Sequence, residues 1–458
     1  MAIMTRQQAK ELLTRVLELS EADECQCSLS GSNQGNIRFA RNTVTTSGEV
    51  SDVTLAVQSS FGKRTGAASV NEFDDASLER VVRRSEELAR LAPENPEWVP
   101  LLGPQEYKET PTWSEATANV TPEQRARAAD ASITPSKKND LVVAGFLDDS
   151  ETFDAIMNNK GLFAYNLRTA CNFTATIRTA DGTGSGWASR DYTDVTKLDT
   201  ASASQVAIRK SLDSRDAKAM EPGRYTVILE PAASAQLLAN MVGAMDQRAA
   251  DEGRSFLSRK TEDGKKAPED APHNRAGEKL FDERVTIYSD PAHPQVPTPA
   301  FAGDGHAVGR TVWIDKGVVK VLPNSRYWAE KTGVPYRPTA FTGGGIFGGN
   351  TQFIMEGGNR SLEEMIADTR RGVLVTRTWY IRAVDPQTLL YTGLTRDGTF
   401  FIEDGEIKYP IKNFRFNESP IVMLNNIEEL GVPVRIDGRM VPPMKIRDFT
   451  FSSLSDAV

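Results

Sequence analysis

The chain alternates between two hydrophobic patterns, one with the period of a helix and one with the period of a strand. In residues 7–19 the apolar positions recur every three or four residues after Thr5, which suits an N-cap, so this stretch predicts an amphipathic helix. Residues 76–91 and 199–213 are predicted to be helices as well. At 121–124 the sequence Thr-Pro-Glu-Gln places proline at the first helical position of a capping box, which predicts one more helix start.

Strand patterns occupy most of the remaining first half. The predicted strands there are 25–30, 35–39, 50–58, 141–146, 153–157 and 161–177. The last three are expected to form an antiparallel meander that turns at Asn-Asn-Lys-Gly, residues 158–161. We therefore expect an N-terminal domain, residues 1–221, that mixes helices with antiparallel strands, and a boundary near Pro222.

The second half reads as mainly strands and turns. It opens with a strand, a Pro turn and an amphipathic helix in residues 224–249, and a charged segment, 261–274, follows with almost no apolar residues. Further strands are predicted at 285–288, 312–315, 317–322, 373–381, 389–392, 399–402 and 406–409. A last helix is predicted from Pro420 through Leu430. The fold class is therefore α+β, with residues 222–458 as a β-rich C-terminal domain.

Composition narrows the class of protein. A chain of 458 residues with 39% hydrophobic and 25% charged residues is typical of a globular protein with more than one domain. The sequence contains no run of 18 apolar residues, so no membrane span is predicted. Its three cysteines lack the spacing of a disulfide framework, which favours a reducing cytoplasm. A net charge of −8 argues against a general nucleic-acid surface, which needs clustered cations. We expect a cytoplasmic protein with neither membrane nor nucleic-acid partners.

The residue types that bind catalytic zinc are scarce. A catalytic zinc site needs three protein ligands, usually His, Cys or carboxylate. The three histidines, His273, His293 and His306, are predicted to lie in solvated loops, and no two of them are spaced to share a helix face. Cys25 and Cys27 are spaced to pack on one face of a strand. The sequence therefore predicts no metal site, no cofactor and no catalytic residues.

Two glycine-rich stretches have competing interpretations. The stretch 342–350 contains Gly343, Gly344, Gly345, Gly348 and Gly349. It could form a close contact with another chain or with an extended substrate, because glycine removes the side chain, or it could be a flexible surface loop. The stretch 181–187 is interpreted as a strand turn, since no helix follows it. Gly184-Ser185-Gly186 lacks the elbow motif of serine hydrolases.

Several segments spread along the chain resemble the TldD/PmbA family, which comprises bacterial and archaeal two-subunit metallopeptidases. These segments are 36–41 with 66–69, the turn 158–161, 277–291, and the C-terminal segments 395–398, 402–407 and 412–419. Residues 224–249 resemble the strand and helix on which the metal-bearing subunit carries His-Glu-x-x-x-His. The resemblance covers nearly the whole chain.

The resemblance implies a subunit without zinc. At the six motif positions this chain has Ala239, Asn240, Met241, Val242, Gly243 and Ala244, so the degenerate metal-site positions are Ala239, Asn240 and Ala244. The metal-bearing subunit also draws a Cys ligand from its C-terminal half, whereas this chain has no Cys after Cys171. The chain therefore resembles most the metal-free PmbA (TldE-like) subunit. Its partners would be a zinc-bearing TldD-like homologue in a heterodimer, or a second copy of itself, and a peptide substrate.

Two functions follow from the resemblance. In the first, the chain is the non-catalytic subunit of a cytoplasmic TldD-type zinc metallopeptidase that acts on unfolded or modified peptides, and it is inactive alone. In the second, it is a homodimeric peptide- or ligand-binding protein of the same fold with no peptidase activity. A neighbouring gene for the His-Glu-x-x-x-His homologue would favour the first.

Overall fold

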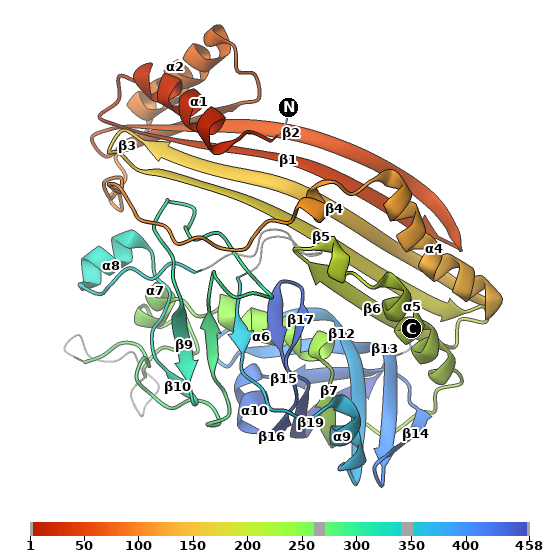
Figure 1. Ribbon diagram of the computed structural model, residues 1–458. Helices are drawn as coiled ribbons and strands as arrows, with labels where there is room; N and C mark the ends of the chain where they lie inside the picture. Colours follow the sequence, from red (N-terminus) through yellow and green to blue (C-terminus); the bar gives the residue numbers. More distant parts are fainter. Residues whose placement is uncertain (1–2, 261–270, 340–350, 456–458) are drawn as a thin grey trace.

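A long, curved antiparallel sheet arches over a C-terminal half that is built around a small barrel (Figure 1). The computed structural model describes residues 3–260, 271–339 and 351–455. The chain passes from the sheet to the barrel between residues 213 and 223. The predicted α+β fold class is confirmed.

The N-terminal sheet has six strands in the order β3-β2-β1-β4-β5-β6. The strands are β1 (Glu24–Ala40), β2 (Thr43–Phe61), β3 (Arg64–Val70), β4 (Leu141–Asn158), β5 (Phe163–Thr179) and β6 (Ser185–Tyr192). Two predictions of short strands are wrong here, because 25–30 joins 35–39 in β1 and 141–146 joins 153–157 in β4. The polar residues between them continue as strand because β1 is paired on both sides, with β2 and with β4.

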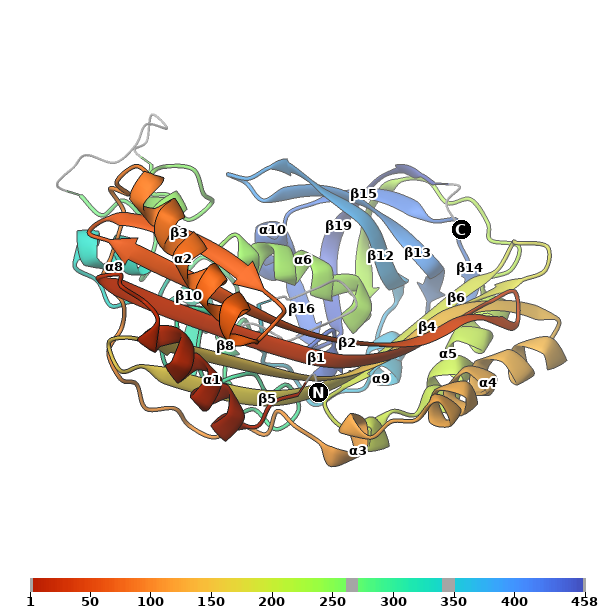
Figure 2. The same cartoon turned by 90° about the horizontal axis from the view of Figure 1, so that it is seen from above.

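Helices cover one face of this sheet. They are α1 (Arg6–Glu18), α2 (Asp75–Leu91), the short α3 (Glu115–Ala118), α4 (Pro122–Lys138), the 3₁₀ turn η1 (Val195–Lys197) and α5 (Thr200–Asp213). Odd-numbered residues of β1 pack under both pairs of long helices: Cys25 and Cys27 lie in the core beneath α1 and α2, and Phe39 lies beneath α4 and α5. Since successive strand residues point to opposite faces, all four long helices pack on the same face of the sheet. Figure 2 shows α1 and α2 toward one end of the sheet and α4 and α5 toward the other. Helix α5 also contacts the C-terminal half, where Nζ of Lys210 lies 2.6 Å from Glu230.

The capping signals in the sequence located the starts of two helices. Thr5 and Gln8 form a complete capping box at α1, and Thr121 and Gln124 form another at α4. Arg125, in the first turn of α4, binds Asp149 of β4 through Nε at 2.5 Å and Nη2 at 3.0 Å, and both side chains are buried. This two-point ion pair fixes α4 on the sheet.

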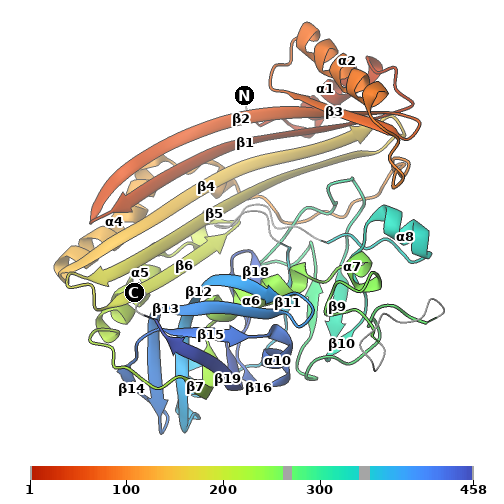
Figure 3. The same ribbon diagram turned by 180° about the vertical axis from the view of Figure 1, so that it is seen from behind.

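The opposite face of the sheet is polar along β1. The even-numbered residues of β1 on this face are Gln26, Ser28, Ser30, Ser32, Gln34, Asn36 and Arg38. By register the same face carries Asp148 of β4, Asn172 of β5, and Ser185, Trp187 and Asp191 of β6. Figure 3 shows that the sheet curves over the C-terminal half. The polar residues of this face therefore lie on the side of the sheet that faces that half.

The C-terminal half is built on a barrel. Its strands are β7 (Gly223–Leu229), β12 (Arg371–Asp385), β13 (Leu390–Glu403), β15 (Phe414–Glu418) and β19 (Met444–Leu454). They pair in the order β12-β7-β19-β15-β13, and a second pairing of β12 with β13 closes the ring. Buried aromatic residues such as Phe414, Phe449 and Phe451 fill it. Two further strands extend the sheet, β14 (Glu406–Pro410) on β13 and β16 (Ile427–Leu430) on β19.

A smaller sheet and short helices complete this half. The sheet contains β8 (Ile287–Ser289), β9 (Thr311–Asp315), β10 (Val318–Val319), β11 (Ile354–Met355), β17 (Val434–Ile436) and β18 (Arg439–Val441). The helices are α6 (Pro231–Gly243), α7 (Gln247–Asp251), α8 (Arg326–Thr332), α9 (Leu362–Ala367) and α10 (Pro420–Asn425). None of the helices in the described ranges combines the length and apolar character that crossing a bilayer requires.

Two helices differ from their predictions. The helix expected through Leu430 ends at Asn425, because Ile427 and Leu430 pair with β19 and are buried as β16. The helix expected within 224–249 ends at Gly243, and Asp246 then caps α7 by accepting a hydrogen bond from the N–H of Ala249 at 2.7 Å. Burial of the β16 side chains in the first place, and the second N-cap at Asp246 in the other, outweigh the helical spacing of apolar residues.

Candidate functional site

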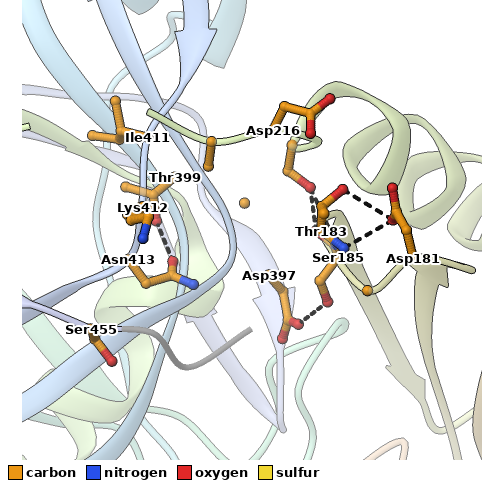
Figure 4. Close-up of a pocket in the computed structure, with 14 residues that line it drawn as sticks. Asp181, Thr183, Ser185, Asp216, Asp397, Thr399, Ile411, Lys412, Asn413 and Ser455 are labelled. Atoms are coloured by element: carbon orange, nitrogen blue, oxygen red, sulfur yellow. Dashed lines mark hydrogen bonds between the residues drawn. The ribbon is translucent and has the colours of Figure 1, made fainter. Parts of the chain in front are cut away.

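Two cavities lie where the last strand of the sheet, β6, meets the barrel. The first encloses about 310 Å³ and is bounded by the β5–β6 turn, the end of α5 and strand β13 (Figure 4). Asp181, Thr183 and Asp216 lie on its sheet side, and Thr399 and Asn413 lie on its barrel side. The described residues of its lining offer carboxylates, hydroxyls, the amide of Asn413 and the amino group of Lys412, but no imidazole and no thiol.

One carboxylate joins the sheet to the barrel at this cavity. The Ser185 hydroxyl donates a hydrogen bond of 2.7 Å to one oxygen of Asp397, and Nη1 of Arg377 lies 3.0 Å from the other. Asp397 is buried, and a register shift between β12 and β13 leaves it and Gly398 outside the strand ladder. Asp397 therefore connects Ser185 of the sheet with Arg377 of the barrel through one hydrogen bond and one buried ion pair.

The glycines around Ser185 have a packing role. A Cβ added at Gly186 would lie 2.0 Å from the carbonyl oxygen of Ala207, and one added at Gly184 would lie 2.2 Å from that of Ser211. Helix α5 therefore rests directly on the backbone of β6. The structure confirms that 181–187 is a strand turn, with Gly182 at φ 75°.

The second cavity encloses about 400 Å³ between β6, α6, β12 and the β17–β18 hairpin. We name it the arginine pocket and define it by the lining residues Trp187, Gln236, Arg377, Trp379, Arg382 and Arg439. Nη1 of Arg439 lies 2.8 Å from Asp437, and Arg377 is paired with Asp397 of the first cavity. Burial lowers the pKa values of Arg377 and Arg439, and the carboxylate beside each opposes this effect.

Aromatic rings and guanidinium groups alternate in one wall of the arginine pocket. The guanidinium of Arg377 lies 4.3 Å from the ring centroid of Trp187 and 5.1 Å from that of Trp379. Arg396, which is not part of the lining, lies 4.8 Å from the Trp379 ring. Each cation therefore rests on the face of an indole, which fixes the position of its planar group.

The backbone of β12 is irregular beside this wall. Tyr380 has φ 54°, and the register of β12 against β13 shifts between Trp379 and Arg382. A bulky residue in this left-handed region is an outlier, and such strain costs on the order of 1–3 kcal/mol. The bulge frees Tyr380 and Ile381 from pairing with β13, and the side chain of Tyr380 is 57% exposed.

Helix α6 runs from the lining of the arginine pocket toward residues 239–244, where the sequence predicted a degenerate metal site. Ala235 and Gln236 line the pocket, and Ala239 and Asn240 lie one turn further along the same face. Nε2 of Gln236 donates to Oδ1 of Asn240 at 3.3 Å. Ala244 is the C-cap of the helix.

Comparison with known families identifies the chain. The family model for the PmbA/TldA metallopeptidase C-terminal domain matches residues 222–453, and the model for metallopeptidase domain 1 matches residues 25–89. The chain belongs to the PmbA/TldD metallopeptidase family. This match confirms the family resemblance seen in the sequence.

Individual relatives agree with this assignment. A curated protein named metalloprotease from Methanothermobacter thermautotrophicus is 29% identical over 171 residues, which are 35% of this chain and 36% of that protein. The chain thus matches about a third of the length of that relative.

Solved structures share the fold at low sequence identity. TldE from Thermococcus kodakarensis is 20% identical with a TM-score of 0.83, covering 97% of this chain and 99% of its own. A candidate modulator of DNA gyrase from Bacteroides thetaiotaomicron is 20% identical with a TM-score of 0.83, covering 99% and 100%. Another, from Thermotoga maritima, is 17% identical with a TM-score of 0.82, covering 97% and 100%.

The residues on α6 do not fit the zinc that the family implies. Ala239 and Ala244 offer only methyl groups, which pack against the C-terminal core, and the Asn240 amide is bound to Gln236. Nowhere in the described parts of the chain do three His, Cys, Asp or Glu side chains gather as they would around a metal ion. No step of a reaction can be derived through a metal held by these side chains.

The candidate histidines lie in loops, and Cys25 and Cys27 lie in the core. His273, His293 and His306 are in loops as predicted, but they are half-buried rather than solvated, and the His306 ring packs at 4.7 Å from the ring of Tyr336. Burial lowers the pKa values of His293 and His306. Cys25 and Cys27 are buried in the helix–sheet core, as predicted. Gly343, Gly344, Gly345, Gly348 and Gly349 lie outside the described residues, as does most of the charged segment 261–274.

Sequence reasoning missed the arginine pocket. Residues 377–382 read Arg-Thr-Trp-Tyr-Ile-Arg and were interpreted only as part of a strand. The available signal was Arg377 and Trp379 two residues apart, since a strand face that carries both a cation and an indole is unsuited to a dry core. The distant Trp187 and Arg439 could not be associated with them without the fold.

Proposed function

We propose that this chain is the PmbA/TldE-like, non-catalytic subunit of a cytoplasmic TldD-type zinc metallopeptidase complex that acts on unfolded or modified peptides. The observation that carries the proposal is the helix face of α6, where Ala239, Asn240 and Ala244 stand in place of two imidazoles and a carboxylate. A zinc hydrolase of this kind needs those groups to hold the metal and to activate water. The missing chemistry would come from a zinc-bearing homologue.

A subunit without zinc can still contribute to such an enzyme. The polar face of the long sheet and the arginine pocket form a concave, hydrophilic surface within one chain. A homologue of the same fold, related by a pseudo-twofold axis, would close this surface into a chamber that admits unfolded peptides and excludes folded proteins. The chain would supply walls and substrate contacts rather than catalysis.

Reconstitution with the partner tests this proposal. The His-Glu-x-x-x-His homologue from the same genome is purified with and without this chain, and cleavage of an unfolded protein is followed by mass spectrometry. We expect the chain alone to be inactive and the mixture to cleave. Chelator-sensitive cleavage by the chain alone would contradict the proposal.

A second candidate is a homodimeric peptide- or ligand-binding protein without peptidase activity. The arginine pocket supports this second candidate, because binding of a ligand in the pocket requires no metal. A genome that lacks the zinc-bearing homologue, together with a dimer in light scattering, would select this alternative. Two structural relatives carry names that refer to DNA gyrase, but we propose no nucleic-acid partner, because the net charge of this chain is −8.

A further inference from the structure

We propose that the arginine pocket binds a carboxylate group on a peptide, so that this chain selects peptides bearing an acidic side chain or a free C-terminus. The inference rests on the proposed function, because it names the class of peptide that this subunit would contribute to holding. It is nevertheless testable on the chain alone.

Among the described residues, the carboxylates near the pocket leave one of its cations, Arg382, without an ion-pair partner. Arg377 and Arg439 are each compensated by a carboxylate, at 3.0 Å and 2.8 Å. Arg382 differs: among the described residues its recorded close neighbour is an aromatic ring, with its guanidinium 4.6 Å from the centroid of Tyr380, and no carboxylate there lies at ion-pair distance. An incoming carboxylate would neutralise this charge through two parallel N–H···O bonds, which suit the planar guanidinium.

The strained backbone places this cation in advance. The bulge at Tyr380 interrupts pairing with β13 and brings the exposed ring beside Arg382. Contact with the ring restricts the long arginine side chain, so less conformational entropy is lost when a ligand binds. Strain of this kind persists only where the surrounding structure maintains it, and it is concentrated at binding sites.

The rest of the lining suits a peptide rather than a polyanion. Trp379, 38% exposed, offers an apolar surface for a neighbouring side chain, while Gln236 can exchange hydrogen bonds with backbone amides. The volume of about 400 Å³ lies within the range of small-ligand sites. A chain with a net charge of −8 repels long polyanions while still accepting a single carboxylate at a local cation.

Isothermal titration calorimetry on the full chain compares three ten-residue peptides of Ala, Gly and Gln with one Phe. The first has blocked ends and a central aspartate, the second replaces that aspartate with asparagine, and the third adds a free C-terminal carboxylate to the second. We expect the first or the third to bind at least about tenfold more tightly than the second, and the stronger of the two identifies the carboxylate source. Equal affinity for all three, or tighter binding of adenosine monophosphate, would overturn the proposal.

Substitutions locate the effect in the pocket. Arg382→Gln should abolish the preference for a carboxylate, and Arg382→Lys should retain part of it, because the charge remains but the two-point geometry is lost. Arg127→Gln is the matched control, an exposed arginine on the outer face of α4, and it should bind like the wild type. Circular dichroism verifies that each variant is folded.

The outcome is separable from the proposed function. A preference that survives Arg382→Gln would refute the pocket assignment. If the wild type shows no preference yet still activates the zinc-bearing partner, the carboxylate proposal fails alone. If the preference is present but no partner is activated, the proposed function fails alone.

Discussion

At the scale of single residues, the carboxyl group of Asp148 in β4 lies on the polar face of the sheet, where burial disfavours its charged form. It accepts a hydrogen bond of 2.9 Å from Nδ2 of Asn172. Burial raises the pKa of Asp148, and the hydrogen bond from Asn172 only partly offsets this. The folded protein therefore holds the proton of this carboxyl more tightly than the unfolded chain.

The raised pKa of Asp148 has a consequence for stability. Ionisation costs more in the folded state, so the contribution of Asp148 to stability decreases as the pH rises from its unfolded pKa through its folded pKa. We expect Asp148→Asn to match the wild type in free energy of unfolding at acidic pH and to exceed it at neutral pH. Urea titrations at several pH values measure this difference. A variant less stable than the wild type at neutral pH would contradict it.

At the scale of elements, the sequence predicted well wherever a local signal specifies the structure. The capping boxes at Thr5 and Thr121 act within one helical turn, and both N-caps lie where they were predicted. The continuous strand β1 and the strand β16 depend instead on partners distant in sequence. A short window of sequence contains no information about such partners.

The contact of α5 with β6 is an element-scale feature that can be tested. Gly186→Ala should destabilise the protein by about 1–3 kcal/mol. The new methyl group would meet the Ala207 carbonyl oxygen, so helix α5 would have to move. Gly243→Ala is the matched control in α6, where nothing lies within 4 Å of the added carbon. It should stabilise by about 0.5–1 kcal/mol through helix propensity. Chemical denaturation of both variants compares these effects, and equal changes would count against the close packing.

At the scale of the whole molecule, the sequence led to the hypothesis of a helix without metal ligands, but it did not predict the cavity beside that helix. The hypothesis needs only the six residues 239–244, which include no His and no Glu. The arginine pocket combines β6 from the N-terminal half with β12, α6 and β18 from the C-terminal half. Closure of the barrel and the arch of the sheet bring these elements together, and neither leaves a local signature.

A buried carboxylate fastens the two halves beside that pocket. Asp191 of β6 accepts hydrogen bonds from Nε of Arg435 at 2.8 Å and from the N–H groups of Asp437 and Gly438 at 2.8 and 2.9 Å. Asp191→Ala should lower the stability by about 2–4 kcal/mol, since several charge-assisted bonds are lost. It should also separate the unfolding of the two halves in scanning calorimetry. Asp213→Ala, at the exposed end of α5, should leave one transition, and one unchanged transition in both variants would contradict this role.

The proposed function requires that this chain does not hold zinc by itself. Elemental analysis of the purified chain, after incubation with zinc and removal of excess metal, measures this directly. We predict far less than one zinc per chain, while the reconstituted complex contains about one zinc, supplied by the partner. One zinc bound tightly per isolated chain, lost when residues around Ala239 and Ala244 are altered, would contradict the account.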